Sequence, residues 1–262
     1  MLGDQFEQAL TQELVDTIVE LQSLPGLATF ALAGGTSLAL RFNHRRSVDI
    51  DLFSNQVVGK VGLETIISEL KEIYEKDLVH FEIIDPEAGD QFYFLRAFIR
   101  KSKELIIKVE IIQNIAVLDT FEYYKGIRTL SLRDIGLLKL VSASNRKAKK
   151  DIYDLDFITE QIELPDLMMM LEEKQNRYKE AASKSLFDLD REHTPVDNIN
   201  LLLAFDDVDY TALPRRPNHS HDLIDILPSG KNWRLARSSW RRKVINLMRL
   251  RGMEPPSVKP VN

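Results

Sequence analysis

A pair of glycines followed by an Asp-x-Asp pair constrains this 262-residue sequence more than any other feature. An apolar run ends at Gly34 and Gly35, a short helix is expected behind them, and residues 48–53 alternate with the two-residue period of a strand. This period puts Asp49 and Asp51 on one face of the strand. Two carboxylates about 7 Å apart along a strand can share divalent cations, and glycine N–H groups at a helix start can hold a phosphate. Together the two halves predict nucleotidyl transfer.

The glycine pair and the Asp-x-Asp pair each also have a simpler interpretation. Gly34-Gly35 alone is typical of a tight turn, and an Asp-x-Asp strand can be the solvated edge of a sheet. The apolar neighbours Ile50 and Leu52 favour an interior strand instead. A charge on an interior strand costs free energy unless it meets a cation or another partner, so the pattern as a whole favours a metal site.

A third carboxylate is expected on a later strand. Residues 105–112 alternate, and this puts Lys108 and Glu110 on one face, opposite the apolar side chains. If that strand neighbours the strand of Asp49 and Asp51, Glu110 would complete a metal-binding triad. The alternative is an ordinary cross-strand ion pair or a solvated face.

Several motifs occur in an order that identifies a family. Residues 34–40 read Gly-Gly-Thr-Ser-Leu-Ala-Leu, and residues 44–53 read His-Arg-Arg-Ser-Val-Asp-Ile-Asp-Leu-Phe. This combination resembles the nucleotidyltransferases of the AbiEii/AbiGii abortive-infection toxin family, within the DNA polymerase beta-like superfamily. Residues 134–140 and 150–155 are similar to the family's second and third motifs, and residues 205–207 also match its pattern. The resemblance covers most of residues 5–207.

The resemblance implies an enzyme that moves a nucleoside monophosphate from a nucleoside triphosphate (NTP) to an acceptor and releases pyrophosphate. Two Mg²⁺ ions would be held by Asp49 and Asp51, with Glu110 shared between the ions or acting as a base. Lys139 would offset charge on the leaving pyrophosphate, and Asp154 would lie beside the nucleotide. The implied nucleotide-binding set is Gly34, Gly35, Thr36, Ser37, Arg45, Arg46, Ser47, Lys139 and Asp151. From the residues alone, Lys139 could also extend to solvent, and Asp151 could simply complement the dipole of its own helix.

The expected fold class is α+β, with a nucleotidyltransferase-type small mixed sheet and flanking helices, followed by a helical domain. The predicted parts are a catalytic domain over 1–125, a helical domain over 126–207 that closes on the nucleotide, and a basic, partly disordered C-terminal extension over 208–262. Apolar periodicity predicts strands over 29–33, 48–53, 78–84, 92–99 and 105–112, and helices over 4–23, 37–42, 62–75, 151–158, 166–185 and 238–251, with a further helix beginning at 131.

Composition narrows the classes of protein. There is no cysteine, so disulfides, thiolate metal sites and cysteine nucleophiles are excluded. The N-terminus lacks the pattern of a signal peptide, and no apolar run is long enough to span a bilayer, so we expect a cytoplasmic protein without membrane contact. The net charge of −5 does not itself indicate a nucleic-acid binder.

The basic end of the chain nevertheless favours an RNA acceptor, and the resemblance implies a tRNA end. Eight Lys and Arg residues lie between 231 and 251, with only Glu254 expected as their counter-charge. The family context adds a cognate antitoxin as partner and a role in phage defence. The rival hypotheses are a transferase that modifies a small molecule such as an antibiotic, or a protein, and a catalytically inactive nucleotide-binding regulator.

Overall fold

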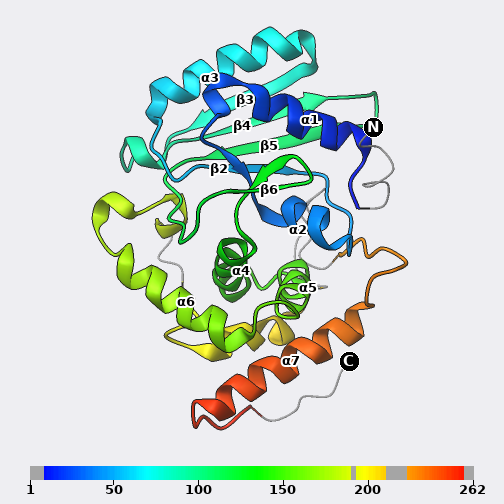
Figure 1. The fold of residues 1–262 in the computed structure, drawn as a ribbon, viewed down its shortest axis with the longest axis vertical. Coiled ribbons are helices and arrows are strands. Elements are labelled where there is room, and N and C mark those ends of the chain that lie inside the picture. The colour runs from blue at the N-terminus through cyan, green and yellow to red at the C-terminus, as the bar shows by residue number, and fades with distance from the viewer. Residues whose placement is uncertain (1–8, 190–192, 211–222, 257–262) are drawn as a thin grey trace. The chain divides into compact units, whose positions relative to one another are not determined.

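The computed structural model of this chain describes residues 9–189, 193–210 and 223–256 (Figure 1). The first residues of the helix predicted over 4–23, and parts of the extension predicted over 208–262, lie outside these ranges.

A seven-stranded mixed sheet forms the centre of the fold, with strand order β3-β4-β5-β2-β1-β7-β6 (Figure 1). β2 runs parallel to β5 and β1 runs parallel to β7, whereas the other neighbours are antiparallel. The strands are β1 (Ala31–Leu32), β2 (Ile50–Phe53), β3 (Leu78–Ile84), β4 (Phe94–Arg100), β5 (Ile106–Ile112), β6 (Glu122–Tyr124) and β7 (Ile127–Thr129). This mixed sheet with its flanking helices confirms the predicted fold class.

The α-helices match most of the predicted segments, with shifted ends. They are α1 (Gln12–Ser23), α2 (Gly34–Phe42), α3 (Gly59–Tyr74), α4 (Leu132–Arg146), α5 (Lys149–Ile158), α6 (Leu164–Arg177) and α7 (Trp233–Leu250). The helix predicted over 166–185 ends at Arg177 and is followed by the short 3-10 turns η5 (Ala181–Ser183) and η6 (Leu186–Asp188). A longer 3-10 segment, η7 (Ile199–Asp207), precedes α7 along the chain, and shorter turns are η2 (Pro25–Leu27), η3 (Glu75–Asp77) and η4 (Asp90–Phe92).

The chain divides into two compact units, each with its own set of contacts. The first, called here the sheet unit, groups residues within 1–135, 173–192 and 225–230, and it holds all seven strands. The second, called here the helical unit, groups residues within 136–172, 193–224 and 231–262, and its described residues form helices and loops without a strand. These units are interleaved along the chain, and the three consecutive domains proposed from the sequence stay a prediction.

The core of the sheet unit explains which face of the sheet is free for chemistry. Alternate residues of β5, namely Ile107, Val109 and Ile111, are fully buried and belong to the same apolar cluster as Leu63 and Leu70 of α3. Lys108 and Glu110 therefore point to the opposite face of the sheet, away from this core. The period-two alternation predicted for this strand is confirmed.

Candidate active site

The two glycines begin α2, three residues earlier than the sequence pattern predicts, and both allow close neighbours. Gly34 has φ +61°, a left-handed conformation that favours glycine. A Cβ on Gly34 would collide with the Asp51 carboxylate, and a Cβ on Gly35 would collide with the Arg45 guanidinium. The glycine pair therefore lets an acidic and a basic side chain reach the first turn of the helix.

The N-terminus of α2 fits a phosphate. Its N-cap, Ala33, makes no side-chain hydrogen bond to the helix, and the first-turn N–H groups of any helix lack intrahelical acceptors. Ser37 lies in this first turn, and its buried Oγ has no hydrogen-bond partner among the described residues. An uncapped helix start next to an unsatisfied hydroxyl and the Arg45 guanidinium offers several groups that an anion could bind.

Two hydroxyls predicted to contact phosphate hold the loop after α2. Thr36 Oγ1 lies 2.8 Å from Ser47 Oγ and donates a short hydrogen bond to the carbonyl oxygen of Asp49. Because the Thr36 proton goes to Asp49, the Ser47 hydroxyl donates to Thr36. These bonds fix the backbone on which Asp49 is carried.

The segment 225–227 returns to this loop, which no sequence signal indicated. The Arg46 N–H donates to the Asp225 carbonyl at 2.8 Å, and the Leu227 N–H donates to the His44 carbonyl at 3.3 Å. The Arg46 side chain lies 3.9 Å from the Asp225 carboxylate and is largely exposed, whereas Arg45 is buried. Of the two predicted arginines, Arg45 is thus the one at the start of α2.

The three predicted carboxylates lie on one side of the paired strands. Asp51 of β2 stands opposite Glu110 of β5 in the parallel register, and Asp49 directly precedes β2. Lys108 lies among them: its Nζ is 3.0 Å from Glu110 Oε2 and 3.6 Å from Asp49 Oδ2. We call Asp49, Asp51, Glu110 and Lys108 the sheet cluster. The cross-strand ion pair that the sequence left open as an alternative for Glu110 is present, with Arg96 of β4.

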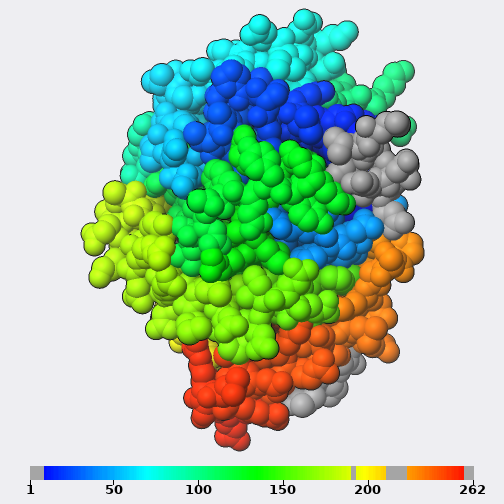
Figure 2. Space-filling view, viewed as in Figure 1, coloured from blue at the N-terminus to red at the C-terminus, as the bar shows by residue number. Residues whose placement is uncertain are grey.

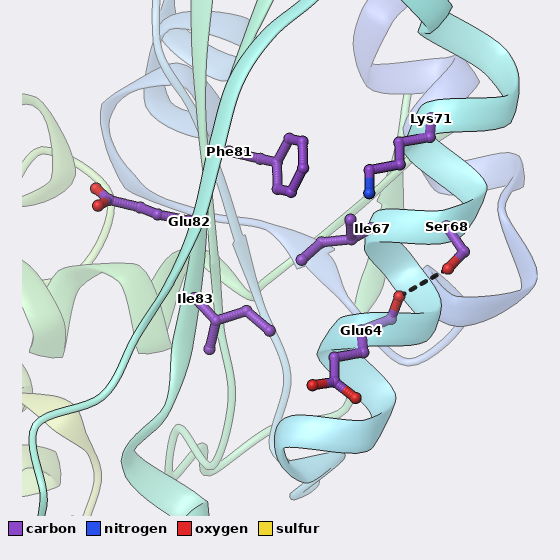
Figure 3. Close-up of a pocket in the computed structure, with 7 residues that line it drawn as sticks. All are labelled: Glu64, Ile67, Ser68, Lys71, Phe81, Glu82 and Ile83. Atoms are coloured by element: carbon purple, nitrogen blue, oxygen red, sulfur yellow. Dashed lines mark hydrogen bonds between the residues drawn. The ribbon is translucent and has the colours of Figure 1, made fainter.

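Further ion pairs extend from Glu110 across the neighbouring strands of the sheet. Arg96 Nε donates to Glu110 at 3.0 Å, and Arg96 Nη1 donates to Glu82 of β3 at 3.2 Å. Figure 3 shows Glu82 on the opposite side of β3 from Phe81 and Ile83, which face α3 across a shallow hollow of about 450 Å³. That hollow therefore lies on the face of the sheet away from the carboxylates.

Burial and charge oppose each other within the sheet cluster. Burial alone would raise the pKa of Glu110, but the cations of Lys108 and Arg96 outweigh it and hold this pKa below its usual range. Burial alone would lower the pKa of Lys108, but the carboxylates of Asp49, Glu110 and Asp51 outweigh it and raise this pKa. Both groups are therefore ionised at neutral pH. A carboxylate with a lowered pKa is a weak base, which favours a ligand role for Glu110 over a base role.

The donor chemistry fits magnesium, although the arrangement described is not a finished metal site. Carboxylate oxygens are the hard ligands that Mg²⁺ prefers. Within the described ranges, however, no group of three or more His, Asp or Glu side chains is arranged to hold a metal ion. A visible cause is Lys108, whose ammonium contacts two of the three predicted ligands.

The other predicted residues, Lys139, Asp151 and Asp154, form a second cluster in the helical unit, called here the helical cluster. Lys139 Nζ of α4 lies 2.8 Å from Asp151 Oδ1 and 2.7 Å from Asp154 Oδ2, both on α5. Arg146 Nη2 is 3.0 Å from the Asp151 carboxylate as well. Burial alone would raise the pKa of Asp151, but Lys139 and Arg146 outweigh it and hold the pKa below its usual range. Lys139 is buried and paired, so the solvent-exposed alternative is wrong for it.

The basic C-terminal segment is more neutralised than its sequence indicates. Asp206 accepts from Arg237 and Arg241, and Asp156 accepts from Lys231 and Lys243. The expectation that Glu254 is the only counter-charge is therefore wrong, because residues distant in sequence supply the partners. The exposed arginines of the segment, which have no ion pair among the described residues, are Arg234, Arg242, Arg249 and Arg251. Side chains of α7 lie on the molecular surface in the orange-to-red part of Figure 2.

Comparisons with known proteins agree with the motifs. Residues 21–244 match the family described as "Nucleotidyl transferase AbiEii toxin, Type IV TA system". Among solved structures, the chain is similar to MenT4, nucleotidyltransferase toxin Rv2826c from Mycobacterium tuberculosis H37Rv, at 16% sequence identity and a TM-score of 0.47. That similarity covers 90% of this chain and 85% of the other. No curated protein gave a significant match. None of the described helices is long and apolar enough to cross a membrane.

Proposed function

Since this chain belongs to the AbiEii family, the nucleotidyltransferase toxins of type IV toxin–antitoxin systems, we propose how its own residues perform the transfer and on what acceptor. In this reaction an acceptor oxygen attacks the α-phosphorus of an NTP. The bond between the α-phosphorus and the oxygen bridging to the β-phosphate breaks, pyrophosphate leaves, and the acceptor hydroxyl loses its proton.

The observation that supports the proposal most is that acidic side chains lie beside the N-terminus of α2, where a phosphate can bind. The Asp51 carboxylate lies against Gly34 in the first turn of α2, and Glu110 stands opposite Asp51 on the neighbouring strand. A triphosphate on the first-turn N–H groups would therefore place its oxygens beside the acidic groups. The uncapped helix start, Ser37 and Arg45 bind and orient the phosphates in this proposal.

Asp49, Asp51 and Glu110 are the residues that would hold magnesium. The bound metal supplies charge neutralisation of the triphosphate and activation of the attacking oxygen. Thr36 and Ser47 keep Asp49 in position through their hydrogen bonds to its backbone and to each other. The family resemblance assigns Lys139 to the leaving pyrophosphate and Asp151 and Asp154 to the nucleotide, and we retain that assignment as part of the proposal.

We propose RNA, such as a tRNA end, as the acceptor. Support comes from the exposed arginines of α7, which project from one helix and have no neutralising partner within the described ranges. Arginine contacts with phosphates release counterions and bind without regard to sequence. The physiological setting we propose is phage defence, with an antitoxin that restrains the enzyme.

The test is to incubate the purified protein with each α-labelled NTP and total cell RNA in the presence of Mg²⁺. We expect one labelled RNA class, and no label with Asp49→Asn under the same conditions. Label on protein or on a small molecule, with none on RNA, would contradict the proposed acceptor. Equal labelling by Asp49→Asn would contradict the proposed site.

A further inference from the structure

Lys108 lies among the carboxylates that we propose as metal ligands. Its ammonium contacts one oxygen of Asp49 and one of Glu110, and the side chain is only 14% exposed. Asp51 faces the same cluster across the strand pair, so three carboxylates surround one tethered cation. The oxygens that Lys108 neutralises are the oxygens that a divalent cation would coordinate.

A second cation, Arg96, lies next to the sheet cluster and is held differently. Arg96 is held between Glu110 and Glu82, with hydrogen bonds to both, so its guanidinium is anchored on two sides. Lys108 is instead a compact charge on a flexible four-carbon stem that ends at the partly exposed side of the cluster. Of the two cations, Lys108 is the one that can move away without breaking the ion pairs that join β3, β4 and β5.

We infer that Lys108 is a tethered counter-cation that competes with the divalent metal for Asp49 and Glu110, and that its ammonium must leave these carboxylates for metal to bind. This inference rests on the proposed function, because it takes those carboxylates as metal ligands. Before metal binds, the ammonium neutralises the acidic groups and keeps them together at the start of α2. Once metal binds, two like charges cannot share the same oxygens at contact distance, so Lys108 is displaced. Lys108 is thus a positioning residue that sets the metal concentration at which the enzyme becomes active.

A matched lysine in the same sheet unit provides the control. Lys101 Nζ lies 2.9 Å from Glu20, and the lysine side chain is 18% exposed, close to the value for Lys108. Lys101 pairs with one carboxylate that belongs to no acidic cluster. Lys101→Gln therefore removes an ion pair of similar length, made by a lysine of similar exposure, without changing the proposed metal site.

The experiment measures Mg²⁺ binding to the full chain by the rise in melting temperature, without nucleotide. Lys108→Gln should melt lower than wild type without metal, because its carboxylates lose a counter-charge. Its half-saturating Mg²⁺ concentration should fall by about tenfold or more, since one nearby positive charge is removed. Lys101→Gln should match wild type in its Mg²⁺ response, and Lys108→Arg, which keeps the charge, should stay within about threefold of wild type.

The outcomes separate this inference from the proposed function. If wild type responds to Mg²⁺ but Lys108→Gln binds the ion no more tightly, the inference is wrong and the metal site stands. Equal tightening in Lys108→Arg would also overturn it, because charge would not be the cause. If neither wild type nor Lys108→Gln responds, and Asp49→Asn behaves the same way, the proposed metal site itself is wrong.

Discussion

Two lysines in this chain each pair with two carboxylates, but the carboxylates of the two pairs are buried to very different degrees. Lys108 in the sheet unit and Lys139 in the helical unit each pair with two carboxylates at 2.7–3.6 Å. The two acids paired with Lys108 keep 19–27% of their surface, whereas the two acids around Lys139 keep none. The same chemistry therefore gives an accessible cluster in one unit and a sealed cluster in the other.

The degree of burial decides whether the cation of each cluster can be replaced by another. A partly exposed ion pair contributes little to stability, because water and salt compete with it, and its cation can be replaced. Removing one partner from a buried pair leaves an uncompensated charge in a low-dielectric interior, which is strongly destabilising. We therefore expect variants of the sheet cluster to alter activity and metal binding, and variants of the helical cluster to alter folding first.

The largest expected effect contrasts one acid from each cluster. Asp51→Asn should reduce transfer by at least about a thousandfold, because a charged group beside the reacting phosphates is lost, while the melting temperature stays near that of wild type. Asp154→Asn should lower transfer and melting temperature together, because Lys139 loses a buried partner. Labelled-NTP transfer and thermal unfolding, measured on the same preparations, test this contrast. A stable, inactive Asp154→Asn would remove the distinction between the clusters.

The next effect compares the two lysines directly. Lys139→Ala should lower the free energy of unfolding by about 3–5 kcal/mol, the usual cost of breaking a buried ion pair. Lys108→Ala should lower it by about 1 kcal/mol or less, as for a partly exposed pair. Urea unfolding curves measure both values. If the folded fraction of Lys139→Ala also turns over about a hundredfold more slowly, the role implied by the family resemblance is supported. Equal stability losses for the two lysines would contradict the account.

The smallest effect concerns the acceptor and the surface of the helical unit. Reversing Arg234, Arg242 and Arg249 to Glu should weaken RNA binding and reduce the salt dependence of log K by about 2, because up to three phosphate contacts are lost. The control reverses three exposed lysines of the sheet unit, Lys60, Lys76 and Lys103, with the same change in net charge. Fluorescence anisotropy with labelled RNA at several salt concentrations measures both. Equal losses in both variants would show that net charge alone, and not α7, governs binding.

Periodicity was enough to predict on which side of the sheet the candidate carboxylates lie. The alternation over 48–53 and 105–112 placed Asp51 and Glu110 on faces that the parallel register then brings together. The register itself depends on tertiary pairing between strands far apart in sequence, so the sequence did not predict the contact between Lys108 and Asp49. The glycine pair was recognised, but its closeness to Asp51 and Arg45 depends on how the loop after α2 folds back.

The pattern of charged residues predicted ion-pair partners less well than the pattern of apolar residues predicted buried faces. The basic run between 231 and 251 gave no sign that Asp156 and Asp206 neutralise four of its cations, because these ion pairs join residues 31 to 87 positions apart. The return of segment 225–227 to the loop around His44 has no sequence signature either, since it rests on backbone hydrogen bonds. Apolar faces are fixed locally by helix and strand geometry, whereas charge partners are fixed by the tertiary fold.

In the proposed mechanism, the sheet cluster exchanges its lysine for a metal ion beside the triphosphate. A crystal structure with Mg²⁺ and a non-hydrolysable α,β-methylene NTP tests it most directly. We predict metal coordinated by oxygens of Asp49 and Asp51, triphosphate oxygens at the first turn of α2, and Lys108 Nζ moved out of contact with both Asp49 and Glu110. A metal bound elsewhere, or one bound at the cluster with Lys108 still between its carboxylates, would contradict the account.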